Sequence, residues 1–133
     1  MPNKNILILL PANDFNSEEY LLTKQTFEKE GFKVFISSNS NSLCIADNGI
    51  KVKADVSIFN IHASNFLAVV FIGGNGVRKY WDDVSYQKIA KDFHKSKKVV
   101  GAICAAPVIL ARAGLLSNGN ATCYFTDRRE LEK

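Results

Sequence analysis

Runs of consecutive apolar residues, rather than alternating ones, mark the strands that this chain predicts. The longest runs lie within the predicted strands at residues 4–10, 67–72 and 99–103. Continuous apolar strands of this length are typical of a parallel sheet that helices cover on both faces. Shorter apolar stretches predict two further strands, at residues 32–36 and 121–125.

Helices are predicted between these strands, at residues 17–30, 85–95 and 107–113. Gly31 and Gly114 follow two of them, where a glycine commonly ends a helix, and Pro107 stands at a first-turn position. The regular alternation of strand and helix predicts an α/β fold with a doubly wound, mostly parallel sheet. Ligands of such sheets bind beyond the carboxyl ends of the strands.

The connecting segments carry turn and loop residues. We expect a turn at residues 11–14, a polar loop at 37–42 and a glycine-rich loop at 73–76. Residues 43–45 and 50–52 flank an Asp-Asn-Gly sequence, which predicts a small hairpin outside the main alternation.

Composition indicates one globular domain over residues 1–133. The chain has 133 residues, of which 47% are hydrophobic and 23% charged, a balance that is usual for a single core. The sequence shows neither an apolar run long enough to span a membrane nor a signal-peptide pattern. We therefore expect a cytoplasmic protein that has no membrane partner.

Charge and cysteine content narrow the function further. Lys and Arg total 17 against 13 Asp and Glu, and they are scattered, except for a cluster at residues 95–98. That cluster is interpreted as the solvated end of a helix, so no nucleic-acid partner is expected. Three cysteines without a C-x-x-C pair favour reduced thiols and no metal. The absence of a dinucleotide or phosphate-loop motif predicts no cofactor.

Cys104 is the sharpest candidate for chemistry. It lies between an apolar strand and a helix, beside the small residues Ala105 and Ala106. Backbone N–H groups and the positive end of a helix dipole would favour the thiolate there, so we expect the pKa to fall below about 8.5. The alternative is a small buried hydrophobic residue, as most free cysteines are.

Glu19 and two glycines belong to turns at the same rim of the predicted sheet. Asn16 and Glu19 have the spacing of a capping-box variant, which would be purely structural. Near a thiolate, a desolvated Glu19 could instead hydrogen-bond to sulfur or act as a general acid or base. The backbone N–H groups of Gly73 and Gly74 could form an oxyanion hole rather than a phosphate cradle.

The other nucleophiles and bases are interpreted as structural. His94 lies in a charged helix and His62 in a loop, and neither follows a predicted strand. Cys123 is expected to pack within the strand at residues 121–125, together with its neighbour Tyr124. Cys44, in the hairpin, is expected to have no role.

The motifs together resemble the DJ-1/PfpI superfamily, also called ThiJ/PfpI. They are the first strand with Glu19, Gly31-Phe32-Lys33-Val34, Val69-Val70-Phe71-Ile72-Gly73-Gly74, Val100-Gly101-Ala102-Ile103-Cys104-Ala105-Ala106-Pro107, and Ala113-Gly114-Leu115-Leu116. The resemblance implies a flavodoxin-like three-layer sandwich with a mostly parallel central sheet. It also implies a reactive Cys104 bonded to Glu19, with the backbone amides of Gly73, Gly74 and Ala105 beside it, and a homo-oligomer, most simply a dimer.

The sequence departs from the family pattern in three ways. Ala105 follows the cysteine, where the peptidase-like branch has a histidine. Tyr124 stands where the DJ-1 branch has a histidine. The family usually continues with another strand and a long C-terminal helix, which these 133 residues are expected to lack.

Three functions remain open at this stage. The first is an enzyme in which Cys104 attacks small reactive carbonyl or acyl compounds, as glyoxalases, deglycases and hydrolases do. The second is a non-catalytic oxidative-stress sensor or chaperone-like protein that uses oxidation of the same cysteine. The third is an interaction module without chemistry.

Overall fold

The structure is a computed structural model that describes residues 4–39 and 43–115. Its strands are β1 (Asn5–Leu9), β2 (Asn13–Phe15), β3 (Lys33–Ser38), β4 (Leu43–Ala46), β5 (Lys51–Lys53), β6 (Val56–Ser57), β7 (Ala68–Phe71) and β8 (Val99–Ala102). Its α-helices are α1 (Ser17–Lys29), α2 (Val84–Lys95) and α3 (Pro107–Arg112). Its 3₁₀ helices are η1 (Ile58–Asn60), η2 (Ala63–Asn65) and η3 (Asn75–Tyr80).

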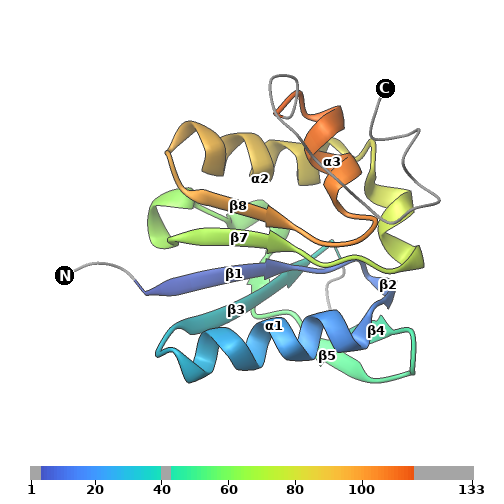
Figure 1. The fold of residues 1–133 in the computed structure, drawn as a ribbon. Coiled ribbons are helices and arrows are strands. Elements are labelled where there is room, and N and C mark those ends of the chain that lie inside the picture. The colour runs from blue at the N-terminus through green and yellow to red at the C-terminus, as the bar shows by residue number, and fades with distance from the viewer. Residues whose placement is uncertain (1–3, 40–42, 116–133) are drawn as a thin grey trace.

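A parallel sheet forms the centre of the described part of the chain, in the strand order β6-β3-β1-β7-β8. Every neighbouring pair of strands in it is parallel. Ile8 of β1 lies between Ile36 of β3 and Val70 of β7, so the longest apolar run occupies the middle of the sheet. The predicted α/β fold is confirmed, and Figure 1 shows helices on both sides of this sheet.

Both faces of β1 are packed, which explains why its apolar residues do not alternate with polar ones. Leu7 belongs to the core under α2, where Phe93 is fully buried. Ile8 belongs to the opposite core, which includes Tyr20 of α1. Each fully buried aliphatic or aromatic side chain of this kind contributes roughly 1.5–3 kcal/mol.

A second, smaller sheet adjoins the carboxyl ends of the main strands, in the order β2-β4-β5. The antiparallel pairing of β4 with β5 confirms the predicted hairpin. The turn predicted at residues 11–14 is wrong in part, because Asn13 and Asp14 belong to β2, which pairs in parallel with β4. Its pairing partner is distant in sequence, and only Phe15 of the strand is buried, so no local pattern indicates it.

The loop predicted from residue 37 is also wrong at its start, since β3 continues through Ser37 and Ser38. Both serines are buried. The Ser37 hydroxyl donates to the Val56 carbonyl at 2.7 Å, and the Ser38 hydroxyl lies 3.5 Å from that of Tyr86. Buried hydroxyls with such partners are tolerated in a strand, although in the sequence they look like a loop.

Several short elements were not predicted, namely β6, η1, η2 and η3. Each has too few residues to show a hydrophobic period. The boundaries of the predicted helices and main strands agree with the structure to within two residues. The strand predicted at residues 121–125, with Cys123 and Tyr124, lies outside the described residues. Within the described part of the chain, no helix is long and apolar enough to span a membrane.

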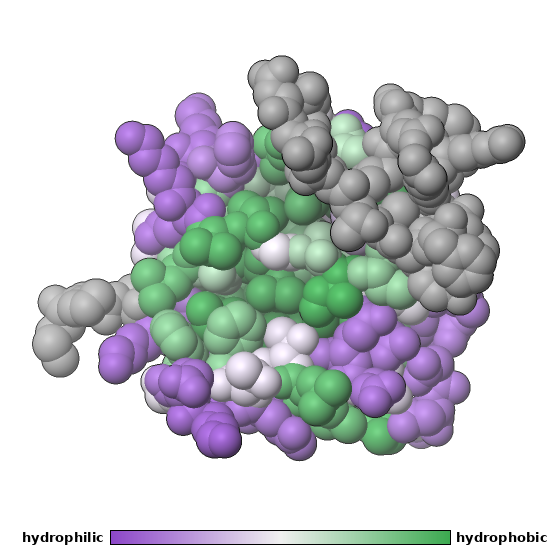
Figure 2. Space-filling model, viewed as in Figure 1, coloured by the Kyte–Doolittle hydropathy of each residue, from purple (hydrophilic) through white to green (hydrophobic). Residues whose placement is uncertain are grey.

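Apolar side chains gather across the middle of the face shown in Figure 2, over β1, β7 and β8. Val99 of β8 is paired with Ala68 of β7, which belongs to the core under α1. Val99 is nevertheless 68% exposed, and Leu22 of α1 is 57% exposed. In the described part of the chain, α1 packs mainly on β3, and this face of the sheet is exposed at Val99 of β8.

Candidate active site

Cys104 lies at the sharp turn between β8 and α3, as the sequence predicts. Its backbone has a φ of 60°, in the left-handed region that residues other than glycine rarely adopt. Ala105 and Ala106, which follow, are 1% and 0% exposed, and Pro107 begins the helix. Strained backbone of this kind is a feature of nucleophile elbows, where it presents the reactive side chain at the rim of a sheet.

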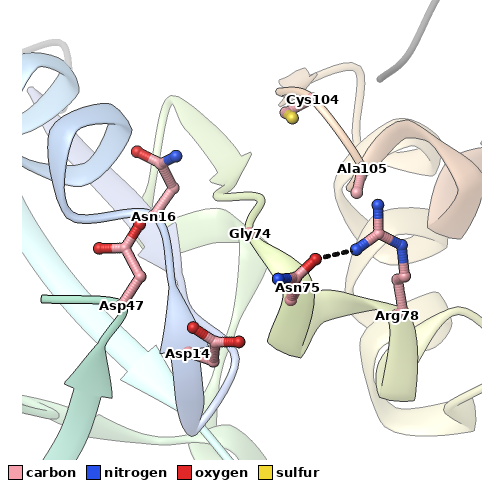
Figure 3. A pocket seen from close by; sticks show the side chains of 8 residues that line it. All are labelled: Asp14, Asn16, Asp47, Gly74, Asn75, Arg78, Cys104 and Ala105. Atoms are coloured by element: carbon pink, nitrogen blue, oxygen red, sulfur yellow. Dashed lines mark hydrogen bonds between the residues drawn. The ribbon is translucent and has the colours of Figure 1, made fainter. Parts of the chain in front are cut away.

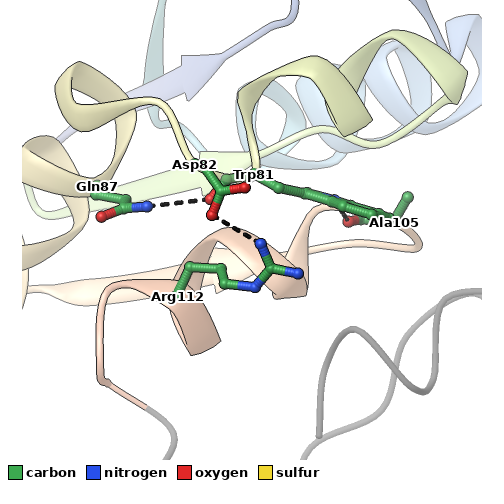
Figure 4. A network of polar contacts seen from close by, with 5 residues as sticks. All are labelled: Trp81, Asp82, Gln87, Ala105 and Arg112. Atoms are coloured by element: carbon green, nitrogen blue, oxygen red, sulfur yellow. Dashed lines mark hydrogen bonds and ion pairs between the residues drawn. The ribbon is translucent and has the colours of Figure 1, made fainter. Parts of the chain in front are cut away.

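The elbow is held from outside by Trp81, which follows η3. The Trp81 indole N–H donates to the Ala105 carbonyl at 2.9 Å. The Gln87 side chain donates to the Trp81 carbonyl at 3.1 Å. Arg112 of α3 lies 5.9 Å from the centre of the Trp81 ring and forms a 2.7 Å ion pair with Asp82. Figure 4 shows that these contacts connect α3 to the segment before α2.

Glu19 lies in the first turn of α1 and contacts the elbow directly. Its carboxyl is hydrogen-bonded to the Cys104 thiol, and its Oε1 accepts from the Gly73 N–H at 3.0 Å. Desolvation raises the pKa of Glu19, and the bonds from Gly73 and Cys104 only partly oppose that effect. The carboxyl therefore holds its proton to a higher pH than an ordinary glutamate does.

Of the two hydrogen bonds that define a capping box, the structure has only one, so the capping-box interpretation of Glu19 is wrong in part. Asn16 does cap α1, because its side-chain oxygen accepts from the Glu19 N–H at 2.9 Å. The Asn16 N–H, however, donates to the Gly73 carbonyl at 2.9 Å rather than to the Glu19 carboxyl. The Glu19 side chain is thus directed to Gly73 and Cys104.

Neighbouring segments approach the loop so closely that Gly73 and Gly74 have no room for a side chain. A Cβ on Gly73 would lie 2.7 Å from the Ile103 carbonyl oxygen, 2.9 Å from Cβ of Cys104 and 3.0 Å from Oε1 of Glu19. A Cβ on Gly74 would lie 2.6 Å from the Asn16 nitrogen, and Gly74 has a φ of 112°. The absence of side chains here brings the loop against both α1 and the elbow.

A polar cavity of about 180 Å³ opens at the elbow. Figure 3 shows the residues that line it, which are Asp14, Asn16, Asp47, Gly74, Asn75, Arg78, Cys104 and Ala105. The Arg78 guanidinium donates to the Asn75 side-chain oxygen. The sequence pattern does not indicate Asp14, Asp47 or Arg78. Asp14 and Asp47 approach Cys104 through the pairing of β2 with β4, and Arg78 lies in η3, a short element that no local pattern predicts.

The other described candidates, His62, His94 and Cys44, do not line the Cys104 cavity. His62 and His94 are both exposed. Cys44 is fully buried, and desolvation raises the pKa of its thiol. In the described residues, no group of three or more His, Cys, Asp and Glu side chains is placed to hold a metal ion.

Fold and site together define a flavodoxin-like α/β protein with a candidate nucleophilic cysteine at the sheet rim. Comparison with known proteins agrees, because residues 4–133 match the sequence pattern of the DJ-1/PfpI family. The chain belongs to this family, which confirms the resemblance of its sequence motifs.

Individual relatives support the same assignment. The solved structure of a ThiJ/PfpI domain protein from Brachyspira murdochii has a TM-score of 0.96 and 33% identity, and the match covers 99% of this chain and 76% of that one. An uncharacterised protein from Methanocaldococcus jannaschii is 34% identical over 125 residues, which are 93% of this chain and 61% of that protein. Deglycase PfpI from Pyrococcus furiosus is 27% identical over 125 residues, 94% of this chain and 75% of the relative. The chain is thus similar to only part of each of these proteins.

Proposed function

We propose that Cys104 is the nucleophile of an enzyme that acts on small reactive carbonyl or acyl compounds. The observation that carries this proposal is the hydrogen bond between Cys104 and Glu19 at a strained elbow that opens into a polar cavity. The name of the relative from Pyrococcus furiosus, a deglycase, supports the same class of chemistry.

The first step of the proposed reaction is addition to the carbonyl carbon. The Cys104 thiolate forms the C–S bond, while the π electrons of the carbonyl move to its oxygen. Glu19, which is protonated at the start, gives its proton to that oxygen and becomes a carboxylate. With an aldehyde, the product of this step is a hemithioacetal.

An acyl compound follows the same path, with a different fate for the proton. The leaving group departs with the electrons of its bond to carbon, takes the proton from Glu19 and leaves a thioester on Cys104. Water then attacks the thioester and gives a proton to the Glu19 carboxylate, and the thiolate leaves. Desolvation raises the pKa of Glu19 above that of an ordinary glutamate, which favours the protonated form that this step needs.

Backbone amides complete the proposed site. The Gly73 N–H already donates to Glu19, so in the proposal it holds the acid, although the sequence suggested it as an oxyanion donor. Gly74 and Ala105 line the cavity beside Cys104, and their N–H groups are the proposed donors to the developing oxyanion.

Rates with native protein and single variants test this proposal. We would measure methylglyoxal consumption and 4-nitrophenyl acetate hydrolysis for native protein, Cys104→Ser, Glu19→Gln and the control Cys44→Ala. We expect background rates for Cys104→Ser and a loss of roughly 10²-fold or more for Glu19→Gln. Cys44→Ala should keep the native rate per folded molecule. Equal rates for native protein and Cys104→Ser would overturn the proposal.

A second candidate function is sensing of oxidants through the same thiol. It is favoured by the contrast between Cys104, which is partly exposed at a polar cavity, and Cys44, which is fully buried. The Cys104 thiolate would attack one oxygen of hydrogen peroxide, break the O–O bond and take up the OH group as a sulfenic acid, while the other oxygen leaves as hydroxide. Peptide mass spectrometry after dilute peroxide should find added oxygen on Cys104 before Cys44. Oxidation at equal rates would exclude this function.

The assembly and location of the protein are also proposals. The family resemblance favours a homodimer, and the exposed apolar side chains of Leu22 and Val99 are compatible with a protein interface. Sedimentation equilibrium would measure the mass, and a monomer at micromolar concentration would contradict the dimer. The single domain over residues 1–133 and the cytoplasmic location remain predictions from the sequence.

A further inference from the structure

The two walls of the Cys104 cavity carry charges of opposite sign. Figure 3 shows Asp14 and Asp47 on the wall next to the start of α1, across from Cys104. Arg78 lies on the other wall, near Ala105 of the elbow. A molecule that reaches Cys104 therefore lies between a pair of carboxylates and a guanidinium.

The carboxylates are available to a bound molecule. Asp14 is exposed, and among the described residues its carboxylate has no hydrogen bond or ion pair. Asp47 is also exposed, and one of its oxygens accepts from the Ser17 N–H at 3.2 Å. Two carboxylates face one guanidinium, so the ionised groups of the lining leave an excess of negative charge beside the nucleophile.

The field of this wall reaches the reacting groups. The Asp47 carboxylate acts electrostatically on Glu19, in the direction that raises the pKa of Glu19. The Glu19 carboxyl is in turn hydrogen-bonded to the Cys104 thiol. A positive group held between Asp47 and Cys104 would be stabilised by the same field, whereas a negative group would be repelled.

We propose that this cavity selects carbonyl or acyl substrates that carry an ammonium group. Asp14 and Asp47 bind the ammonium while the carbonyl carbon lies at Cys104. Arg78 lies on the elbow side, where the carbonyl oxygen becomes negative as the C–S bond forms. This inference deepens the proposed function and rests on it only for the identity of the reacting atom.

Charged thiol reagents measure the selectivity without requiring catalysis. 2-(Trimethylammonio)ethyl methanethiosulfonate and 2-sulfonatoethyl methanethiosulfonate have the same spacer and opposite charges. Each reacts with a thiolate to form a disulfide and release methanesulfinate. The rate of modification of the Cys104 peptide would be followed by mass spectrometry, with Cys104→Ser as the blank. The ratio of the two rates is divided by the same ratio for free 2-mercaptoethanol.

We expect this normalised ratio to favour the cation about tenfold at low salt, as two carboxylates at short range allow. It should fall at least about threefold in Asp14→Asn and in Asp47→Asn, and also in 0.5 M salt, which screens exposed charges. Any change in the thiol pKa affects both reagents alike and cancels in the ratio. Glu30→Gln is the matched control. Glu30 is exposed at the C-terminal end of α1, far from the cavity, and its substitution removes the same charge. It should leave the ratio unchanged.

A ratio near one, or a ratio that neither aspartate substitution changes, would overturn the inference. A parallel assay compares the 4-nitrophenyl esters of glycine and propionic acid, which are similar in size. A higher kcat/KM for the glycine ester, reduced by Asp14→Asn, would support the ammonium site. If hydrolysis depended on Cys104 but showed no preference for the charged ester, the ammonium site would be excluded and the proposed enzyme would stand. A charge preference in thiol modification without hydrolysis would remove only the proposed enzyme.

Discussion

Glu19 connects protonation to stability at the scale of a single residue. In the folded protein, desolvation raises the pKa of Glu19 above its ordinary value of 4.5. The folded state therefore binds this proton more tightly than the unfolded chain does. Native stability is therefore favoured below pH 4.5 and falls as pH rises through the folded pKa. Glu19→Gln keeps an oxygen for the Gly73 N–H and removes the charge. We therefore expect the difference in the free energy of unfolding, variant minus native, to be larger at pH 7 than at pH 4.

Urea unfolding at both pH values would measure this gain. Glu18→Gln is the matched control, because Glu18 is exposed in the same helical turn and shares the effect of the helix dipole. The difference between the two variants then isolates the buried carboxyl. If the stability of both variants relative to native protein rose by the same amount from pH 4 to pH 7, desolvation would not dominate the pKa of Glu19.

At the scale of the elements, Gly73 determines how closely β7, α1 and the elbow approach. Gly73→Ala would place a Cβ within 3.0 Å of three atoms, two of which belong to the elbow. We expect it to cost about 1–3 kcal/mol of stability through overpacking and to slow alkylation of Cys104. Thermal unfolding and iodoacetamide kinetics would measure both effects.

Gly101 provides the matched control for this substitution. A Cβ there would meet nothing closer than 3.8 Å, from Val70, so Gly101→Ala should be tolerated. The two variants add the same methyl group to neighbouring segments. A similar loss of stability in both would mean that the clash at Gly73 is not the cause.

The contact of Trp81 with the elbow predicts a separate effect on the thiol. Trp81→Phe removes the donor to the Ala105 carbonyl, which belongs to a residue only 1% exposed. We expect a loss of about 1–3 kcal/mol from the unsatisfied carbonyl, together with a shifted pH profile of Cys104 alkylation. Phe59→Leu, at a side chain 82% exposed, should change neither. An unchanged pH profile in Trp81→Phe would limit this residue to a structural role.

Sequence patterns predicted those elements whose burial is local and regular. β1 and β7 were recognisable because the whole sheet buries their apolar residues on both faces. Cys104 was selected because it follows a strand directly, and Glu19 because it lies in the segment after the first strand, at the same rim of the sheet. Asp47 and Arg78 were not selected, because no sequence motif marks either of them. They reach the cavity through contacts between distant segments: the turn after β4, which pairs with β2, and η3.

At the scale of the whole molecule, the two cores meet at β1 and should unfold together. Leu7 faces the core under α2, and Ile8 faces the core under α1. Leu7→Ala and Ile8→Ala should each cost about 2–5 kcal/mol. Because the same strand carries both side chains, each loss should destabilise both faces of the sheet.

The only tryptophan of the chain makes this cooperativity measurable. Trp81 packs against the core under α2, so its fluorescence reports directly on one face, while circular dichroism reports on all elements. We expect Ile8→Ala, on the opposite face, to shift the urea midpoint of both signals equally, as a two-state transition requires. A fluorescence midpoint that stayed at the native value while the dichroism midpoint fell would show that the two faces unfold separately. The Cys104 elbow, which Trp81 holds, would then be stabilised by the α2 face alone.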